Sequence, residues 1–226
     1  MKTREIDRAD LKGGGYAAQP DGDGPHPGVV VIHEAYGLNE NIKEITRRFA
    51  ENGYAALAVD LFADRNRALC MARYMTGMLI GSVDRPGIGD LKSALTYLAA
   101  MPDVDPHRVG AIGFCMGGGF AVAWACTDDR LKAIAPFYAS NPRRIEVVKR
   151  MCPVVGSYPE KDFTAGAGRA LGQALDQYKI DHDIKIYPGA GHSFFNPQGR
   201  AYNKAAAQDS WDRVMAFFGK HLTTSA

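Results

Sequence analysis

The residue of this chain best suited to covalent chemistry is a cysteine that lies between glycines. It belongs to the segment Gly113-Phe114-Cys115-Met116-Gly117, which follows an apolar stretch and precedes a run of small residues. A strand that turns sharply into a helix has this pattern, with the nucleophile at the turn and a glycine two positions before and after it. The N-terminus of the helix then favours the reactive thiolate. The alternative for such a segment is an inert buried cysteine.

An acid and a histidine follow in the order that a catalytic triad requires when its nucleophile lies at a sharp turn from a strand into a helix. Asp162 follows an expected strand over residues 153–158, and His192 follows an expected strand over 183–187. Glu160 competes for the acid position, but Asp162 is favoured because it lies farther into its loop. Taken singly, a loop aspartate is more often a helix cap and a lone histidine is more often structural. Their joint order and placement favour catalysis.

The loop after the first core strand supplies the remaining groups, and it reads His33-Glu34-Ala35-Tyr36. We expect the backbone N–H groups of Ala35 and Met116 to bind the oxyanion of a tetrahedral intermediate. A Glu34 carboxylate at the end of a strand is placed to exchange a proton with the thiol. The alternatives for Glu34 are a charge at the rim of the site or a helix cap. We interpret His33 as structural.

The elements that position these residues alternate between strand and helix. Residues 29–32 form an unbroken β-branched run, which predicts a buried strand, and residues 39–53 have the apolar spacing of a helix. Further strands are expected over 54–62, 108–113, 131–138, 152–158 and 183–188, and helices over 89–100, 117–126, 142–150, 166–179 and 201–221. The pattern predicts an α/β fold with a mostly parallel, doubly wound sheet of about eight strands and helices on both faces.

Two parts of the chain are less regular. The segments before residue 29 are expected to form edge strands. Residues 63–86, which carry several arginines, are expected to form either a helix or a lid-like excursion. No linker divides the chain, so we expect residues 1–226 to form one domain.

Composition excludes several classes of partner. The chain has 27 Lys and Arg against 25 Asp and Glu, and a net charge of +2 is too small to predict a nucleic-acid or membrane surface. The charged N-terminus has no signal-peptide core, no apolar run has the length of a membrane span, and the four cysteines show no disulfide framework. We therefore expect a soluble cytoplasmic protein. The six histidines form no cluster with ligand spacing, so neither a metal nor another cofactor is expected.

Four segments taken together resemble one known family. In the order HEAYGLNENIK, GFCMGGG, PEKD and GAGHSFFNP, they are similar to the dienelactone hydrolase family of α/β hydrolases, and the resemblance covers nearly the whole chain. It implies the α/β-hydrolase fold, with Cys115 as nucleophile and Asp162 and His192 as its partners. It also implies that Ala35 and Met116 form the oxyanion hole, and that Glu34 accepts the thiol proton when substrate displaces it.

The resemblance is incomplete at the carboxylate-binding positions. Family members that act on dienelactone bind the substrate carboxylate with two arginines, one before the central helix and one soon after the catalytic histidine. Arg73 matches the first, but the residues after His192 include no arginine until Arg200. Dienelactone as the substrate therefore does not follow from the resemblance. We expect Arg73, Tyr36 and Phe194 to contact the substrate, although such aromatic residues are also common in protein cores.

Together these residues predict a hydrolase that cleaves small-molecule lactones or activated carboxylic esters through a thioester acyl-enzyme. One alternative keeps the triad but changes the substrate to a thioester, a peptide or an organophosphate. Another is a non-catalytic binding member of the fold. A nucleotide-binding domain is disfavoured because no GxGxxG follows the first core strand and no GxxxxGK(S/T) occurs. A monomer or a small homo-oligomer is expected.

Overall fold

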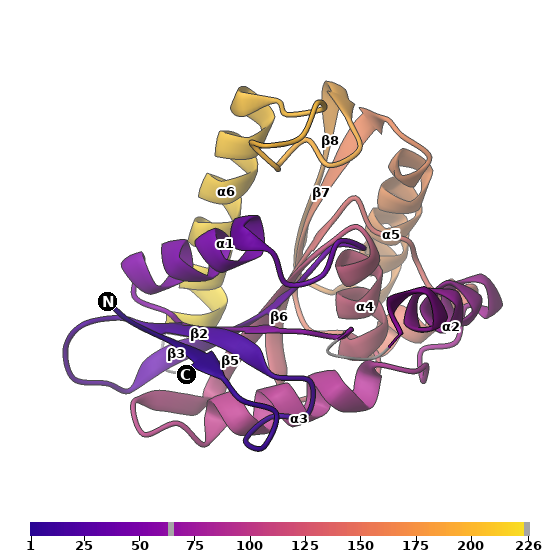
Figure 1. Ribbon diagram of the computed structural model, residues 1–226. Coiled ribbons are helices and arrows are strands. Elements are labelled where there is room, and N and C mark those ends of the chain that lie inside the picture. Colours follow the sequence, from indigo (N-terminus) through magenta and orange to yellow (C-terminus); the bar gives the residue numbers. More distant parts are fainter. Residues whose placement is uncertain (63–65, 224–226) are drawn as a thin grey trace.

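The computed structural model describes residues 1–62 and 66–223, and its centre is a twisted sheet (Figure 1). The sheet has eight strands in the order β1-β2-β4-β3-β5-β6-β7-β8. Strand β2 is antiparallel to both of its neighbours, and the other pairs are parallel. The strands are β1 (Lys2–Ile6), β2 (Gly15–Gln19), β3 (His26–Ile32), β4 (Ala55–Val59), β5 (Val104–Phe114), β6 (Leu131–Phe137), β7 (Val154–Lys161) and β8 (His182–Gly191). The predicted fold class is confirmed. Of the N-terminal segments, β1 is an edge strand as expected, whereas β2 lies inside the sheet between β1 and β4.

Helices cover both faces of the sheet (Figure 1). They are α1 (Glu40–Glu51), α2 (Arg67–Ile80), α3 (Ile88–Ala99), α4 (Met116–Ala125), α5 (Thr164–Tyr178) and α6 (Lys204–Phe218), with a 3-10 helix η1 (Ile145–Arg150) and a π-helical turn η2 (Gly219–Thr223). Val29 and Val31 of β3 pack in the same core cluster as residues of α1 and α6, whereas Val30 and Ile32 pack with residues of α3, α4 and α5. Because successive side chains of a strand point to opposite faces, the run of β-branched residues packs in the apolar core on both faces of the sheet.

Most predicted helices and strands occur at their expected places, and most differences concern the residues at which an element begins or ends. The helix predicted over 39–53 is α1, and the side chain of Asn39 caps it by accepting from the N–H of Ile42 at 3.1 Å. The segment predicted as a helix over 142–150 forms only the short η1. Of the segment 63–86, residues 67–80 form α2, and residues 63–65 lie outside the described part of the chain.

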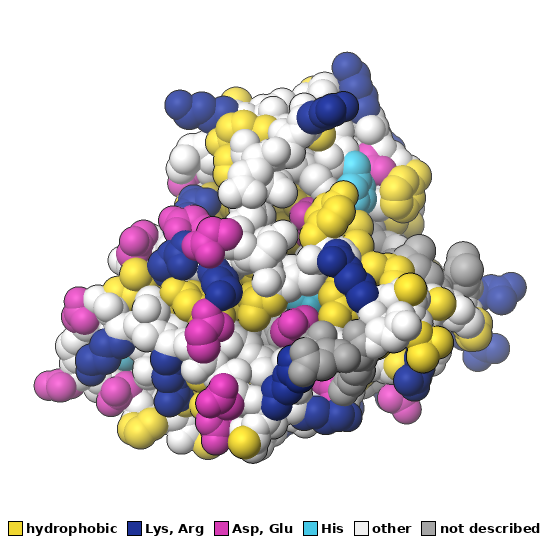
Figure 2. Space-filling model, in the orientation of Figure 1, with side chains coloured by type: hydrophobic (Ala, Val, Ile, Leu, Met, Phe, Trp, Pro, Cys, Tyr) yellow, Lys and Arg dark blue, Asp and Glu magenta, His cyan; other side chains and the backbone are white. Residues whose placement is uncertain are grey.

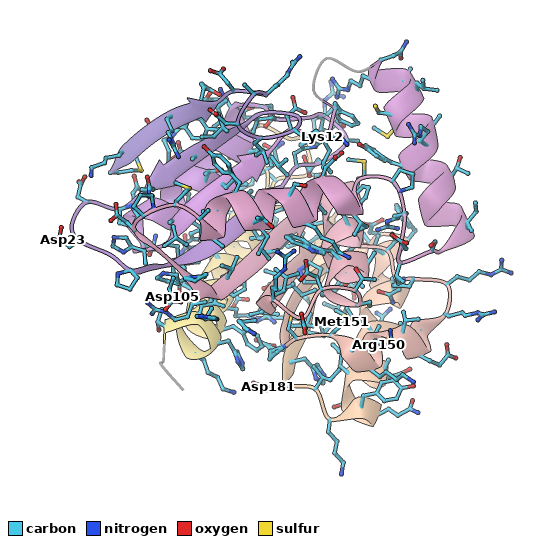
Figure 3. The ribbon with its side chains drawn as sticks, turned by 90° about the horizontal axis from the view of Figure 1, so that it is seen from below. Lys12, Asp23, Asp105, Arg150, Met151 and Asp181 are labelled. Carbon is cyan, nitrogen blue, oxygen red and sulfur yellow. The ribbon has the colours of Figure 1, made fainter. Side chains whose placement is uncertain are left out.

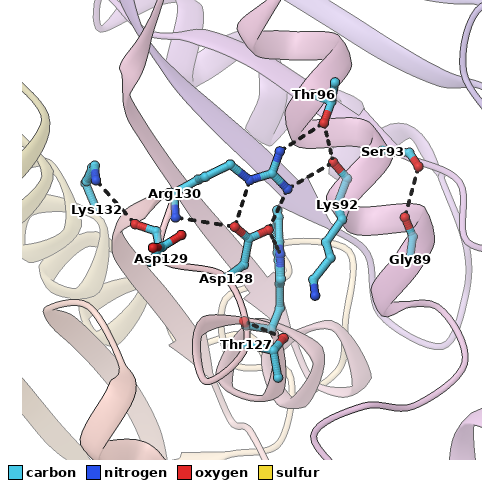
Figure 4. Close-up of polar contacts among 10 residues, drawn as sticks. Gly89, Lys92, Ser93, Thr96, Thr127, Asp128, Asp129, Arg130 and Lys132 are labelled. Atoms are coloured by element: carbon cyan, nitrogen blue, oxygen red, sulfur yellow. Dashed lines mark hydrogen bonds and ion pairs between the residues drawn. The ribbon is translucent and has the colours of Figure 1, made fainter.

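A partly buried polar network joins α3 to the end of α4 (Figure 4). Arg130 forms an ion pair with Asp128 at 2.7 Å and also donates to the Thr96 hydroxyl of α3 at 3.0 Å. Asp128 in turn accepts a hydrogen bond from the indole N–H of Trp124, whose side chain is fully buried in α4. The helix that begins beside Cys115 is therefore fixed at its far end by a charge-assisted contact.

The surface carries both signs of charge. On the face drawn in Figure 2, Lys and Arg side chains are interspersed with Asp and Glu. Within residues 1–62 and 66–223, no helix has the length and apolar character needed to cross a membrane.

Candidate active site

Cys115 lies at the turn between β5 and α4, and its backbone is strained. Its φ of 54° and ψ of −113° fall outside the regions that L-residues usually adopt. A Cβ atom built at Gly113 would lie 2.2 Å from the carbonyl oxygen of Gly117, and one built at Gly117 would lie 2.6 Å from the carbonyl oxygen of His33. Neighbouring backbone therefore leaves no room for a side chain at either glycine of the predicted turn. This crowding holds the half-buried Cys115 side chain at the N-terminus of α4.

The acid and the histidine meet at the ends of two neighbouring strands. Asp162 directly follows β7 and His192 directly follows β8, and the imidazole Nδ1 lies 2.5 Å from Asp162 Oδ2. The Thr164 hydroxyl donates to the same oxygen at 2.8 Å, so the buried carboxylate is held from two sides. Glu160, the competing acid, is exposed and accepts instead from the backbone N–H of Gly189 at 2.9 Å. The structure brings Asp162, and not Glu160, to the histidine.

Contacts with Cys115 and Asp162 determine the charge of His192. A hydrogen bond with Cys115 is the largest of the causes that raise the pKa of His192 to about 9; burial opposes the rise, and the hydrogen bond with Asp162 adds to it. An imidazole with this pKa is protonated at neutral pH and places a positive charge beside the sulfur. The His192 side chain keeps about a third of its surface exposed, at 32%.

Glu34 is buried beside these groups, and its carboxylate is bound by two hydroxyl groups. Tyr138 and Ser193 each donate a hydrogen bond of 3.0 Å to Glu34 Oε1. The Tyr138 ring also lies 5.0 Å from the ring of His192, measured between centroids. Burial, followed by the nearby Glu34 carboxylate, raises the pKa of Tyr138 well above its usual value, so its hydroxyl stays a donor.

Two further features stabilise this arrangement. Tyr138 and Ser193, like Cys115, have positive φ angles, of 38° and 61°, which are uncommon for non-glycine residues and cluster at functional sites. His33 is fully buried, with Nδ1 2.6 Å from the carbonyl oxygen of Glu34 and Nε2 accepting from the N–H of Leu61 at 3.0 Å. These contacts fit a neutral ring with its proton on Nδ1 and agree with the structural interpretation of His33.

The expected oxyanion donors have free backbone N–H groups. Within the described residues, neither Ala35 nor Met116 uses its N–H in a hydrogen bond. The two residues follow β3 and β5, which are paired strands of the sheet. The Ala35 carbonyl accepts from the guanidinium of Arg67 at 2.7 Å, and this contact links the loop to α2. An oxyanion therefore finds two unused donors here.

The three residues expected to contact substrate differ in accessibility. Tyr36 is 66% exposed beside Ala35 and is available to a ligand. Phe194 is fully buried and packs against Tyr138 and Tyr187, so its expected substrate contact is corrected: it is a core residue that supports Tyr138 from behind. Arg73 is exposed on α2 and lines a cavity whose lining includes none of the residues described above. Its contact with substrate stays a prediction.

An exposed aromatic side chain at the site was not expected from the sequence. Phe163 follows Asp162 and is 83% exposed, yet its ring stacks on His192 with 5.6 Å between centroids and 14° between planes. The exposed ring is therefore accessible to a ligand that reaches His192. The sequence signal was its position next to the triad acid.

No group of three or more metal-binding side chains occurs within the described residues. What the arrangement offers is a thiol paired with an imidazole, a buried carboxylate and two free backbone donors. This set is suited to acyl transfer through a covalent intermediate.

Comparisons with known proteins identify the family of this chain. The model of the dienelactone hydrolase family matches residues 14–222. A protein of Saccharolobus solfataricus named "Putative carboxymethylenebutenolidase" is 34% identical over 231 residues, which cover 86% of this chain and 90% of the relative. A protein of Synechocystis with the same name is 30% identical and covers 96% and 95% of the two chains.

Solved structures give the same result. The crystal structure of a dienelactone hydrolase-like promiscuous phosphotriesterase from metagenomic libraries superimposes with a TM-score of 0.84 at 29% identity, over 97% of this chain and 98% of the other. The acylaminoacyl peptidase of Pyrococcus horikoshii, at 15% identity and a TM-score of 0.76, shares the α/β-hydrolase fold alone.

Proposed function

Because this chain belongs to the dienelactone hydrolase family, we propose that it hydrolyses lactones or activated carboxylic esters of small molecules through a thioester on Cys115. The observation that carries the proposal is the hydrogen bond between Asp162 and His192, together with Cys115 at a strained strand–helix turn. Cys115 is also the largest cause of the raised pKa of His192. A buried structural cysteine has no need of such a partner.

Acylation begins when substrate displaces the resting thiol of Cys115 and the thiol proton passes to Glu34, which leaves a thiolate beside the protonated imidazole of His192. The Cys115 sulfur attacks the carbonyl carbon and forms the S–C bond, while the oxyanion binds the N–H groups of Ala35 and Met116. As the intermediate collapses, the C–O bond to the leaving alkoxide breaks, and His192 gives its proton to that alkoxide. The products of this step are a thioester and a neutral imidazole.

Deacylation uses the same residues in reverse. Neutral His192 takes a proton from water, the resulting hydroxide attacks the thioester carbonyl, and the S–C bond breaks to release the acid and restore the thiolate. For a lactone the leaving alcohol stays tethered to the acyl group, so water must attack before the ring closes again. Asp162 keeps the imidazole oriented through both steps.

We assign Glu34 the proton of the resting thiol. Its buried carboxylate lies at the end of β3, close to the turn that carries Cys115, and is oriented by the hydroxyls of Tyr138 and Ser193. When substrate displaces the thiol, the carboxylate accepts the proton and the thiolate forms at the moment of attack.

The acyl or leaving group lies against exposed aromatic surface. Phe163 on one side of His192 and Tyr36 next to the oxyanion donor Ala35 are the accessible aromatic side chains of the site. They favour planar, apolar substrate groups over small aliphatic ones.

A second candidate substrate is an organophosphate triester. The solved relative titled a promiscuous phosphotriesterase motivates it. The same nucleophile and oxyanion donors also suit a phosphoryl centre.

A substrate panel with matched variants tests the proposal. Lactones, p-nitrophenyl esters and a p-nitrophenyl phosphotriester are assayed with the native enzyme, Cys115→Ala and, as a control thiol, Cys152→Ala. We expect ester and lactone turnover that Cys115→Ala abolishes and Cys152→Ala keeps. Equal turnover by Cys115→Ala refutes the nucleophile, and preferred cleavage of the phosphotriester would move the assignment to the second candidate.

Three broader predictions accompany this function. The four cysteines are free, which agrees with the reducing cytoplasmic location expected from the sequence. One domain over residues 1–226 and a monomer or small homo-oligomer remain predictions.

A further inference from the structure

A cavity with charged walls lies apart from the proposed catalytic residues. Of the residues assigned to the proposed active site, only Arg73 is among those that line it. The cavity has a volume of about 290 Å³ and is formed where α2 and the loop after it meet the start of α3. Its walls include Lys12, Arg73, Arg85, Gly87, Gly89 and Asp90. Figure 3 shows Lys12 on its loop near α3, seen from below.

Arg85 is the unusual member of this group because it is a buried cation without a counter-ion. It is 6% exposed, its Nε has no hydrogen-bond partner, and no carboxylate of the described residues forms an ion pair with it. The described contacts of its guanidinium are the carbonyl oxygen of Gly119 and the face of Phe120, 4.6 Å away. Burial lowers the pKa of Arg85 to about 10. A buried charge that lacks a partner is costly, and an anion would relieve that cost.

The other groups of the cavity add to its positive potential. Lys12 is neutralised by Asp90, with 2.9 Å between Nζ and Oδ1, but Arg73 and Arg85 have no such partner within the described residues. The cavity also receives the N-terminus of the 12-residue helix α3, where Gly87 caps the helix with φ 99° and no side chain occupies the cap. Backbone N–H groups at such a terminus attract anions.

The shape at Gly87 keeps this terminus open to the cavity. A Cβ atom there would lie 2.9 Å from the ring of Phe120 and 3.3 Å from that of Tyr74. The residue must therefore be glycine for steric as well as conformational reasons.

We propose that this cavity binds a small oxyanion, the phosphate or carboxylate group of a small molecule, between Arg73, Arg85 and the N-terminus of α3. The site is separate from Cys115 and does not depend on the proposed hydrolytic function. A volume of about 290 Å³ suits a ligand the size of a phosphate ester or a short carboxylic acid.

Isothermal titration calorimetry with inorganic phosphate, at constant ionic strength maintained with sodium chloride, tests the proposal. We expect saturable binding at one site, weakened about tenfold by Arg73→Ala, which removes a charged donor. Lys12→Ala is also expected to weaken binding because it removes a positive charge from the wall of the cavity. The matched control is Arg169→Ala, which removes an exposed arginine of α5 and is expected to leave the affinity unchanged. The same titration with acetate shows whether carboxylate or phosphate is preferred.

A covalent block separates this site from the catalytic one. Protein alkylated at Cys115 with iodoacetamide is expected to bind phosphate as the unmodified protein does. The proposal is overturned if phosphate does not bind, if Arg169→Ala weakens binding as much as Arg73→Ala, or if alkylation of Cys115 abolishes binding. Arg85→Met removes the buried cation, and its binding is measured if thermal unfolding shows that the variant folds. If it does not fold, Arg73→Ala and Lys12→Ala test the proposal, because both alter exposed side chains.

Discussion

The hydroxyl of Tyr138 donates a hydrogen bond of 3.0 Å to the carboxylate of Glu34, a residue 104 positions earlier in the chain. The contact connects the carboxyl ends of β6 and β3, on either side of the strand that leads to Cys115. Because Glu34 is 3% exposed, the direction of its carboxylate is set by its hydroxyl partners rather than by water. We therefore propose that Tyr138 and Ser193 position the carboxylate that receives the proton of the proposed nucleophile.

Tyr138→Phe is expected to destabilise the protein because it leaves a buried carboxylate with one donor fewer. Hydrogen bonds to charged groups contribute about 1.5–3 kcal/mol, and we expect the free energy of unfolding in urea to fall by about this amount. The matched control is Tyr158→Phe. Tyr158 is also fully buried, but its hydroxyl has no hydrogen-bond partner within the described residues, so its removal is expected to be neutral or stabilising. Equal losses in the two variants would contradict this role of Tyr138.

Asp162→Asn is expected to lower kcat for ester hydrolysis by about a hundredfold or more, because the imidazole loses the acceptor that fixes its tautomer and orientation. Glu160→Gln is the control, since Glu160 is exposed and its one hydrogen bond within the described residues is with the backbone of Gly189. Its activity is expected to stay near that of the native enzyme. If steady-state kinetics showed a low kcat for Glu160→Gln and a native kcat for Asp162→Asn, Glu160 and not Asp162 would be the partner of His192.

Iodoacetamide at neutral pH is expected to modify Cys115 alone. Burial raises the pKa of Cys126 and of Cys152 to about 12, and Cys70 is buried, so these three thiols react slowly. Peptide mass mapping after limited alkylation measures the selectivity. Labelling of several cysteines at similar rates would contradict it.

The pH dependence of this alkylation tests the charge of His192. Its pKa of about 9 lies above the ordinary value of 6.5, so the imidazolium is present at neutral pH and is lost as the pH rises through about 9. Near pH 7 the native protein is therefore expected to be alkylated much faster than His192→Gln, and above about pH 9 the two rates are expected to be equal. By the same sign, the stability that the charged ring contributes is present in full below pH 6.5 and is lost through pH 9. A ratio of rates that does not change with pH would rule out the ion pair.

Gly113→Ala is expected to destabilise the protein by about 3 kcal/mol, because the new Cβ would lie 2.2 Å from the backbone oxygen of Gly117 and neither segment can move without displacing the turn. Gly166→Ala provides the opposite control. Gly166 lies within α5, a Cβ atom added there would meet nothing within 4 Å, and alanine is expected to stabilise the helix by about 0.5–1 kcal/mol. Urea unfolding of both variants checks the pair, and a neutral Gly113→Ala would show that the turn is not crowded.

The sequence was sufficient where local pattern determines structure. The apolar run before Gly113, the small residues after it and the order of Asp162 and His192 follow from strand and helix periodicity, and they led to the strands and helices that the structure has. The loops were less accurate, because β7 and β8 continue through residues 159–161 and 189–191, which were expected to be loop. The choice of Asp162 over Glu160 rested on how far each residue lies beyond the preceding strand. A single turn of the chain determines which of the two carboxylates reaches His192.

Contacts between distant segments were not predictable in the same way. The hydrogen bond from Tyr138 to Glu34 depends on the register of β6 against β5, and the stacking of Phe163 on His192 depends on how two loops approach each other. Phe194 looked like a pocket residue because it lies close to His192, but the chain turns at Ser193 and directs it into the core. Arg85 gave no local signal at all, since its burial results from the packing of α4 against the loop before α3.

Trapping the acyl-enzyme tests most directly whether Cys115 carries the acyl group. Native protein is mixed with p-nitrophenyl acetate, quenched in acid within the first turnover and digested, and the modified residue is located by mass spectrometry, with Cys115→Ala as the control. We predict one acetyl group on Cys115 in the native protein and none in the variant. Turnover without any adduct, or an acetyl group on another residue that persists in Cys115→Ala, would contradict the thioester mechanism.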